Sequence, residues 1–473
     1  MILDNLEPKN VFRYFEEICS IPHGSYHTDK IADYIVEFAK NHKLEYFKDS
    51  HNNVVIKKNA SHDYNGNSTV IIQGHLDMVC AKDDSTNIDF ENQGIEIECN
   101  DKYVFAKGTT LGGDDGIAVA MALAVLDSDS ITHPNLECVF TTDEEVGMLG
   151  ANAMDMSNLK GKYMLNIDSE DEGQFTVSCA GGETMVVEIE KENSTRNYSH
   201  SIQITVNGLT GGHSGVEIDK GRANAIILMG KILDAVNKET DIQLVSIDGG
   251  QKDNAIPFAC CATINTNDVA TVQRVVDDCR ANIENEYSSV EKNLNIFTKH
   301  VDYKAGFDNG VIPFLARVTN GVRAMSKDIS GLVQTSSNLG IIRTDGTKIV
   351  ITFSLRSSVG AQKLALHNEI EELAKNYNAN VSWSGDYPAW EYKKNSRLQE
   401  LCKSVYREQY GTEPEIVAIH AGLECGIFCS KLKELDCISF GPNLLDIHTS
   451  KERMDIASVG RVYQFLLNLL MQI

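Results

Sequence analysis

The sequence lacks the marks of a disulfide-bonded, secreted or membrane-spanning protein. Its twelve cysteines include no C-x-x-C pair, so in a chain of this length we expect buried, reduced thiols in a reducing compartment. The longest uncharged apolar run, residues 116–126, is about half the length that a membrane span needs. The N-terminus also lacks the basic start and apolar stretch of a signal peptide. We therefore expect a cytoplasmic protein.

The sequence is also short of positive charge. It has 43 basic against 67 acidic side chains, and its formal net charge is -24. An acidic surface repels phosphate backbones and anionic lipids, so we expect neither a nucleic acid nor a membrane as a partner. With 473 residues, the chain exceeds what one hydrophobic core supports, which predicts two or three domains.

Short apolar runs alternate with helical patterns in about the first 185 residues. Because this alternation is typical of βαβ units, it predicts an α/β fold with a mostly parallel sheet and helices on both faces. The last segment of the chain supplies side chains that match the chemistry of the first. We therefore predict a metal-binding catalytic domain formed by residues 1–188 and 392–473. An inserted α+β domain at 189–391 would interrupt it.

Candidate metal ligands follow four apolar strand patterns at their carboxyl ends. In open α/β sheets these ends meet at one crevice, so the side chains are expected to converge. A glycine-rich turn at 112–116 adds two aspartates. The candidates at these five places are His75 and Asp77, Asp114 and Asp115, Glu144 and Glu145, Asp168, and His448. Together they predict a metal centre.

Each candidate has a simpler interpretation when it is taken alone. A histidine after a strand is often only hydrogen-bonded, an aspartate pair before a helix is a typical N-cap, and paired glutamates suit a solvated turn. Five such places in one chain favour a shared site instead. Imidazole and carboxylate ligands suit zinc, and also manganese or cobalt. Three carboxylates and a bridging hydroxide would balance the charge of two divalent ions.

Six segments carry a further signal: GHLDMV at 74–79, TTLGGDDG at 109–116, TTDEEVG at 141–147, NIDSE at 166–170, GGHSG at 211–215 and HAGLECG at 420–426. Together they resemble the M20 metallopeptidase family, and within it the bacterial dipeptidases. The resemblance implies two-metal hydrolysis of unblocked dipeptides of broad sequence, including dipeptides that end in histidine. Two departures, at Gly113 and at segment 449–451, remove no ligand and concern substrate preference.

The resemblance also implies a set of metal ligands. His75 and His448 would each bind one of the two ions, and Asp114 would bridge them. Asp168 would complete the site that contains His75, and Glu145 would complete the site that contains His448.

Two further carboxylates would support the reaction in this family. Asp77 would orient the imidazole of His75 and raise its basicity. Glu144 would act as the general base, while a hydroxide that bridges the metals attacks the peptide carbonyl.

Four more residues are expected on the substrate side. By the resemblance, the inserted domain serves as a lid and as the contact of a homodimer, and His213 from the opposite subunit stabilises the oxyanion. Asn254 and Arg356 would bind the substrate, and Gly422 would offer its amide to the peptide carboxylate. The residues alone leave other interpretations open: a structural histidine, a salt bridge of Arg356 and a plain helix start at Gly422.

Two alternative functions stay open at this point. The first is an M20 amidohydrolase that acts on N-acyl amino acids or on a tripeptide. The second is a binding or scaffold protein that has lost the catalytic activity of the family. All five predicted ligands are present together with Asp77 and Glu144. We therefore predict a metal-dependent dipeptidase.

Overall fold

The computed structural model describes residues 2–308 and 310–473, which form two compact units. The first comprises the residues up to Cys179 together with Tyr392–Ala418 and Leu423–Ile473, and the second comprises Ala180–Glu391 and Ile419–Gly422. The boundary expected between residues 188 and 189 falls inside strand β9 (Gly181–Glu190). Since β9 pairs along its length with two strands of the second unit, the chain enters that unit at residue 180.

An eight-stranded sheet forms the centre of the first unit, in the order β1-β2-β6-β3-β7-β23-β8-β22. Its four middle strands, β6, β3, β7 and β23, run parallel, and antiparallel strands flank them. Parallel strands bring their carboxyl ends to one edge of the sheet. The candidate ligands come at or directly after these ends, so they lie at the same edge. The strands are β1 (Glu45–Lys48), β2 (Val54–Lys58), β3 (Thr69–His75), β6 (Asn135–Thr141), β7 (Tyr163–Asn166), β8 (Gln174–Cys179), β22 (Glu415–Ile419) and β23 (Asp436–Ser439).

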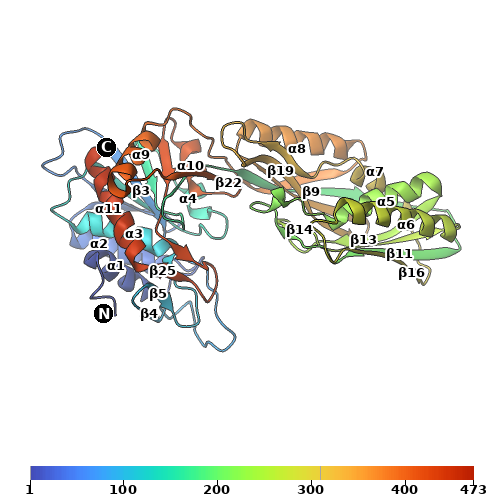
Figure 1. Ribbon diagram of the computed structural model, residues 1–473, viewed down its shortest axis with the longest axis horizontal. Coiled ribbons are helices and arrows are strands. Elements are labelled where there is room, and N and C mark those ends of the chain that lie inside the picture. The colour runs from blue at the N-terminus through green and yellow to red at the C-terminus, as the bar shows by residue number, and fades with distance from the viewer. Residues whose placement is uncertain (1, 309) are drawn as a thin grey trace. The chain divides into compact units, whose positions relative to one another are not determined.

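Helix α3 (Gly113–Asp127) contains the long apolar run of the sequence, and it is buried from residue 115 to 126. It packs against α1 and β3, so the apolar run forms part of the hydrophobic core of the first unit. The other helices of this unit pack on the same sheet or on each other, as α11 does on α9 (Figure 1). They are α1 (Lys9–Cys19), α2 (Asp29–Asn41), α4 (Leu149–Ala153), α9 (Arg397–Tyr410), α10 (Glu424–Lys431) and α11 (Ile456–Gln472).

A small four-stranded sheet joins the C-terminal part of the first unit to its N-terminal part. Its order is β24-β25-β5-β4, and β25 pairs with β5 although about 350 residues separate them. The loop between β24 and β25 carries His448. The strands are β4 (Ile97–Cys99), β5 (Tyr103–Ala106), β24 (Leu444–Leu445) and β25 (Arg453–Asp455).

The second unit is built on an antiparallel sheet with the main order β16-β11-β15-β13-β19-β20-β9-β21. Helices α5 and α6 lie together on it (Figure 1), and one apolar core fills the space between them. Besides β9, its long strands are β11 (His200–Asn207), β13 (Ile242–Gly249), β15 (Cys260–Thr266), β16 (Asn295–Val301), β19 (Val333–Asp345), β20 (Lys348–Ser357) and β21 (Asn380–Tyr387).

Shorter elements and the helices complete the second unit. The pair β12 (Gly212–His213) and β14 (Ala255–Ile256) forms a sheet of its own. The remaining short strands are β10 (Glu192–Asn193), β17 (Phe307–Asp308) and β18 (Gly321–Met325). The helices are α5 (Ala225–Glu239), α6 (Val269–Glu286), α7 (Val311–Leu315), α8 (Gly360–Lys375) and the 3-10 turn Ile218–Lys220.

The predicted fold class is confirmed: the first unit is an α/β domain with a parallel centre, and the inserted unit combines antiparallel strands with helices. Within residues 2–308 and 310–473, none of the helices has the length and apolarity needed to cross a membrane.

Candidate metal centre and substrate-binding residues

The register of the parallel strands brings the strand-end residues of the first unit together. His75 is the last residue of β3 and lies beside Thr141 of β6. On the other side of β3, Gln73 pairs with Asn166 of β7, so Asp168, two residues further on, lies level with His75. Two groups of side chains could each hold a metal ion, with ligand atoms within 4.8 Å of one another: His75, Asp114 and Glu145, and His75, Asp115 and Asp168.

Asp114 lies between the two histidines. Its Oδ1 is 3.1 Å from Nε2 of His75, and its Oδ2 is 3.1 Å from Nε2 of His448. The same nitrogen of His448 is 2.9 Å from Oε1 of Glu145, while Nε2 of His75 is 3.8 Å from Oδ1 of Asp168. All five predicted ligands therefore meet, with one histidine at each oxygen of the shared aspartate.

The local backbone explains how Asp114 reaches this position. Asp114 and Asp115 have non-helical φ and ψ angles inside α3, so the regular helix begins only after them. Their carboxylates do not act as a helix cap. Asp114 faces the two histidines, and Asp115 accepts the backbone N–H of His75 at 3.2 Å.

Asp77 supports several members of the cluster at once. Nδ1 of His75 lies 2.9 Å from the backbone oxygen of Asp77, so Nδ1 carries the proton and Nε2 is left as the ligand atom. The Asp77 carboxylate accepts the backbone N–H groups of Glu144 at 3.0 Å and of Glu145 at 3.3 Å. Ser25 donates its hydroxyl to the same carboxylate at 2.8 Å. Asp77 thus fixes both the imidazole and the turn after β6.

The histidines of the cluster attract protons in this acidic surrounding. Hydrogen bonds to Asp114 and Glu145 raise the pKa of His448 to about 10. Burial lowers the pKa of His75, but its hydrogen bonds to Asp114 and Asp77 outweigh burial and raise the pKa well above its ordinary value. A divalent cation would replace these protons and compete for the same nitrogens.

The carboxylates show the complementary effect. Burial would raise the pKa of Asp114, but hydrogen bonds from His448 and His75 hold it well below its ordinary value. Burial raises the pKa of Asp168 and of Glu144 well above the ordinary values. Negative charge is therefore costly on these two acids unless a cation lies nearby.

A buried carboxylate that the sequence did not single out joins the loop that carries His448 to the turn that carries Asp114. Oε2 of Glu452 accepts the backbone N–H groups of Leu111 at 2.8 Å and Gly112 at 3.2 Å. Oε1 accepts those of Gly113 at 2.8 Å and Asp114 at 3.4 Å. Glu452 follows His448 by four residues, so it ties the His448 loop to the turn that presents Asp114. Two features of the sequence could have suggested this contact: an acidic residue four positions after His448, and a glycine-rich turn whose backbone N–H groups can bind an anion.

Glu424 is a second buried carboxylate that sequence reasoning missed. Its Oε2 accepts hydrogen bonds from Gln73 at 2.5 Å and from Thr141 at 2.6 Å, and Gln73 in turn accepts one from Asn166 at 2.6 Å. This network links α10 to the three strands that precede His75, Glu144 and Asp168. Burial raises the pKa of Glu424 to about 7.

The other predicted residues lie in the second unit. Nδ1 of His213 accepts the backbone N–H groups of Gly215 at 3.1 Å and Val216 at 3.3 Å, so its proton resides on Nε2. Burial lowers the pKa of His213, which keeps the ring a neutral donor. Gly212 suits this turn because its φ angle of 131° is a conformation that residues with a Cβ rarely adopt. Asn254 is tied to the turn, since its backbone oxygen accepts the N–H of Ser214 at 2.9 Å.

Arg356 is buried on β20, and no acidic partner is found for it within residues 2–308 and 310–473. Its Nη1 donates to the Tyr387 hydroxyl at 3.1 Å, and none of the ion pairs in the described parts of the chain involves it, so the salt-bridge interpretation finds no carboxylate. His420, which the sequence analysis did not assign, accepts or donates at Nε2 to Ser336 at 2.7 Å. Burial and the nearby Arg356 lower the pKa of His420 to about 3. Gly422 lies just before α10, which begins at Glu424.

The fold, the cluster and the family comparison together define the class of protein. The chain belongs to peptidase family M20/M25/M40, which matches residues 71–472. It is therefore a metal-dependent peptide hydrolase, and the predicted family and enzyme class are confirmed.

Among individual proteins, the chain is 35% identical to the cytosol non-specific dipeptidase of Escherichia coli over 480 residues, covering 100% of this chain and 99% of that protein. The solved structure of the aminoacylhistidine dipeptidase from Vibrio alginolyticus has a TM-score of 0.93 and 34% identity, covering 100% of this chain and 98% of that chain. An aminopeptidase from Bacillus cereus, with a TM-score of 0.60 and 15% identity over 99% of each chain, shares the fold alone.

Proposed function

We propose that this protein hydrolyses unblocked dipeptides of broad sequence, including those that end in histidine, with two divalent metal ions. The position of Asp114 carries the proposal, because each of its oxygens lies 3.1 Å from the Nε2 atom of a different histidine. One carboxylate between two imidazoles is the arrangement that a bridged pair of ions needs. The similarity to two named dipeptidases supports the choice of substrate.

The donor set fits the proposed ions. His75 and Asp168 would hold one ion, His448 and Glu145 the other, and Asp114 would bridge them. Imidazole and carboxylate donors suit zinc best, with manganese or cobalt as alternatives. Bound ions would lower the pKa of a water molecule and polarise the peptide carbonyl.

Glu144 is the proposed general base, and Asp77 positions it through its backbone N–H. Burial raises the pKa of the Glu144 carboxyl, which suits a group that takes a proton from water and passes it to the leaving amine. Asp77 also fixes the tautomer of His75 through the 2.9 Å contact of its backbone oxygen.

The second unit supplies the proposed groups for the rest of the substrate. Arg356 is a buried cation that forms no ion pair with the residues that the structure describes, so it suits the carboxylate of the peptide. Asn254 and the amide of Gly422 would add hydrogen bonds, and Nε2–H of His213 would stabilise the oxyanion. We further propose that the inserted unit, which the sequence placed at residues 189–391 and which begins at residue 180, acts as a lid and forms the contact of a cytoplasmic homodimer. The first unit would hold the metals.

The test is hydrolysis of matched free and N-acetylated dipeptides by the purified protein, with a chelator and with added zinc or manganese. Cleavage of only the free dipeptides, lost with the chelator and regained with metal, is the expected result. Preference for acetylated substrates would move the function to an acylamino-acid hydrolase. His213→Ala should impair turnover without changing the metal content, and normal turnover of this variant would remove the oxyanion role.

A further inference from the structure

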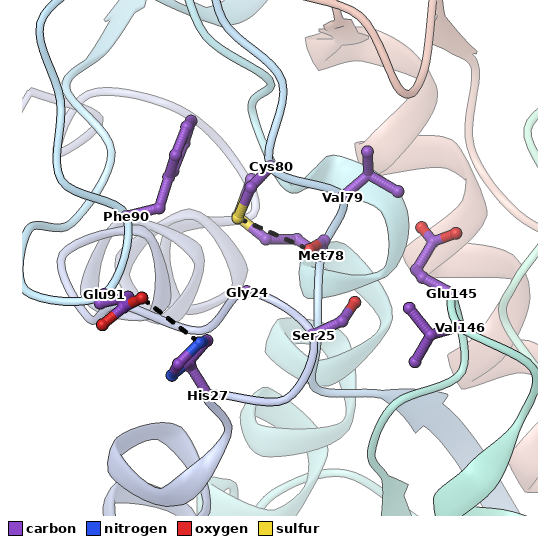
Figure 2. A pocket seen from close by; sticks show the side chains of 10 residues that line it. All are labelled: Gly24, Ser25, His27, Met78, Val79, Cys80, Phe90, Glu91, Glu145 and Val146. Atoms are coloured by element: carbon purple, nitrogen blue, oxygen red, sulfur yellow. Dashed lines mark hydrogen bonds and ion pairs between the residues drawn. The ribbon is translucent and has the colours of Figure 1, made fainter.

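A pocket of 480 Å³ opens in the first unit beside the carboxylate of Glu145. Figure 2 shows Glu145 and Val146 on one side of the view, with Phe90 and Cys80 on the other. The volume lies within the range of small-molecule sites, roughly 300–1,000 Å³. Because Glu145 is also a proposed metal ligand, the pocket begins where the proposed reaction would take place.

The floor of this pocket is continuous with the supports of the metal cluster. Met78 donates its N–H to the oxygen of His23 at 3.1 Å, and Ser25 donates its N–H to the oxygen of Met78 at 3.3 Å. The Ser25 hydroxyl also holds the Asp77 carboxylate at 2.8 Å. Gly24 completes the floor, since a Cβ there would lie 2.5 Å from Sγ of Cys80. A group bound here is therefore held at a fixed position relative to His75 and Glu145.

The outer rim is also ordered by specific contacts. Nε2 of His27 lies 3.6 Å from Oε1 of Glu91 across the rim (Figure 2). Lys30 donates to the backbone oxygen of Glu91 at 2.9 Å, and the N–H of Glu91 donates to the Asp89 carboxylate at 3.1 Å. These bonds hold the neighbouring Phe90 against the pocket, so the site is formed before a ligand arrives.

The lining combines apolar surface with negative charge. Met78, Val79, Phe90 and Val146 offer apolar contacts, which favour burial of an apolar side chain. Burial raises the pKa of the Cys80 thiol to about 11, so this wall is neutral. Of the two carboxylates that line the pocket, Glu145 is a proposed metal ligand, so Glu91 is the one left to act on a substrate, and none of the described lining residues is a lysine or arginine. Such a lining attracts an ammonium group and repels the carboxylate end of a peptide.

We propose that this pocket binds the side chain of the amino-terminal residue of the dipeptide and favours long or aromatic apolar side chains. This inference rests on the proposed dipeptidase function and adds a preference to it. Phe90 and Val146 would contact the side chain, while the Glu91 carboxylate favours the free ammonium group beside it. A substrate with a small first side chain would leave the pocket empty and lose this contribution.

The test compares kcat/KM for Leu-Gly and Ala-Gly with that for Gly-Leu and Gly-Ala. In Phe90→Ala, the ratio of Leu-Gly to Ala-Gly should fall about tenfold, the scale that hydrophobic pocket contacts give, while the ratio of Gly-Leu to Gly-Ala keeps its wild-type value. Phe47→Ala is the matched control, because Phe47 on β1 is 56% exposed and lies outside the pocket. Both of its ratios should stay at the wild-type values.

Three outcomes overturn the pocket proposal but leave the dipeptidase function standing. In Phe90→Ala, both ratios fall equally, or only the ratio of Gly-Leu to Gly-Ala falls. In the third, the wild-type enzyme cleaves the four dipeptides without preferring Leu-Gly over Ala-Gly. A wild-type enzyme that cleaves no unblocked dipeptide overturns the dipeptidase function, and the pocket proposal with it. The failures of the two proposals are thereby distinguishable.

A second measurement needs no change that could disturb folding. Cys80 is the one exposed thiol among the twelve cysteines, so N-ethylmaleimide can reach it, and mass spectrometry would identify which cysteines are modified. The adduct should lower the ratio of Leu-Gly to Ala-Gly, and Cys80→Ser, compared with itself before and after treatment, should show no such loss. If mass spectrometry shows that Cys80 is completely modified and the ratio of Leu-Gly to Ala-Gly is unchanged, the proposal is overturned.

Discussion

At the scale of single residues, the site depends on where neighbouring carboxylates direct their oxygens. Glu144 and Glu145 are adjacent in the sequence, yet Glu145 faces His448 at 2.9 Å, whereas no hydrogen bond of the described residues engages the Glu144 carboxylate. The Asp77 carboxylate accepts the backbone N–H of both. This difference in direction is what supports giving one the role of ligand and the other the role of base.

Replacing Glu144 by glutamine should therefore separate catalysis from metal binding. We expect Glu144→Gln to lower kcat by about 10²–10⁴-fold, the usual contribution of a general base, with two metal ions per chain retained. Metal analysis and steady-state kinetics on the same sample would check both. Asp143→Asn is the control, because the neighbouring Asp143 carboxylate accepts a hydrogen bond from the backbone N–H of Tyr26. The kcat of this variant should stay at the wild-type value. Near-normal turnover of Glu144→Gln would exclude the base role.

Glu452 should matter through the turn that it holds. Glu452→Gln replaces one carboxylate oxygen by an amide that cannot accept, so two of the four N–H groups lose their partner. Because supports of metal ligands are typically worth 10–100-fold in metal affinity or activity, we expect metal content below two ions per chain and a lower kcat.

The control for Glu452 lies in the same loop. Asp446 is exposed and pairs with Arg453, and exposed ion pairs contribute little. Asp446→Asn should keep metal content and rate. If Glu452→Gln also binds two ions with unchanged affinity, its carboxylate only stabilises the loop.

At the scale of elements, α10 is joined to the sheet by an acid that resists ionisation. Burial raises the pKa of Glu424 to about 7 from an ordinary value of 4.5. Between these values the folded protein keeps a proton that the unfolded chain has lost. The free energy of unfolding therefore falls as pH rises from 4.5 to 7, and the loss is complete above pH 7.

Removing this titration should flatten that part of the stability profile. Glu424→Gln keeps an oxygen that can accept from Gln73 and Thr141 but cannot ionise. In chelator-treated protein we expect the variant to lose less stability than the wild type between pH 5 and pH 8, by an amount on the order of 3 kcal/mol. Urea unfolding at several pH values would measure the difference. Parallel profiles for the two proteins would show that Glu424 is ionised throughout.

At the scale of the whole molecule, charge and metal binding are coupled. The formal net charge is -24, and several of the excess carboxylates gather at one buried cluster. Proton uptake by His448, whose hydrogen bonds to Asp114 and Glu145 raise its pKa to about 10, relieves only part of this repulsion. Divalent ions would relieve more, so the native state should be stabilised when they bind.

Removal of metal should lower the thermal unfolding temperature, and zinc or manganese should restore it. Free ion at about 100 times its Kd should add about 2.7 kcal/mol to the stability of the folded state. Asp114→Ala removes the shared ligand, so this variant should bind fewer ions and gain less stability from added metal. Differential scanning calorimetry with and without a chelator would check both proteins. An unchanged unfolding temperature on chelation would contradict a metal site inside the cluster.

The sequence predicted much of the site because its main elements are local. A parallel strand places whatever follows it at the carboxyl edge of the sheet, so His75, Glu145 and Asp168 could be expected to meet once the strands were recognised. Asp114 could be expected there because it opens a helix at the same edge. The family resemblance added the bridging role and the assignment of His448.

Other features depend on contacts between distant parts of the chain, which a single sequence does not reveal. Glu452 bonds to N–H groups 338 to 341 residues away, and Glu424 accepts from Gln73 across 351 residues. The second unit begins at residue 180 and not at the predicted 189, because β9 pairs along its length with β20 and β21 of that unit. The pocket beside Glu145 is built from four separate segments.

The sequence by itself determined the fold class, the peptidase family and the residues that gather at the cluster, because strand patterns and ligand types are written in short segments. Only the tertiary structure decided which oxygen faces which nitrogen, which buried carboxylates hold the turns, and where an apolar pocket opens beside them. Those outcomes depend on side-chain direction and on long-range hydrogen bonds. Both are set by packing, which forms only when the whole unit has folded.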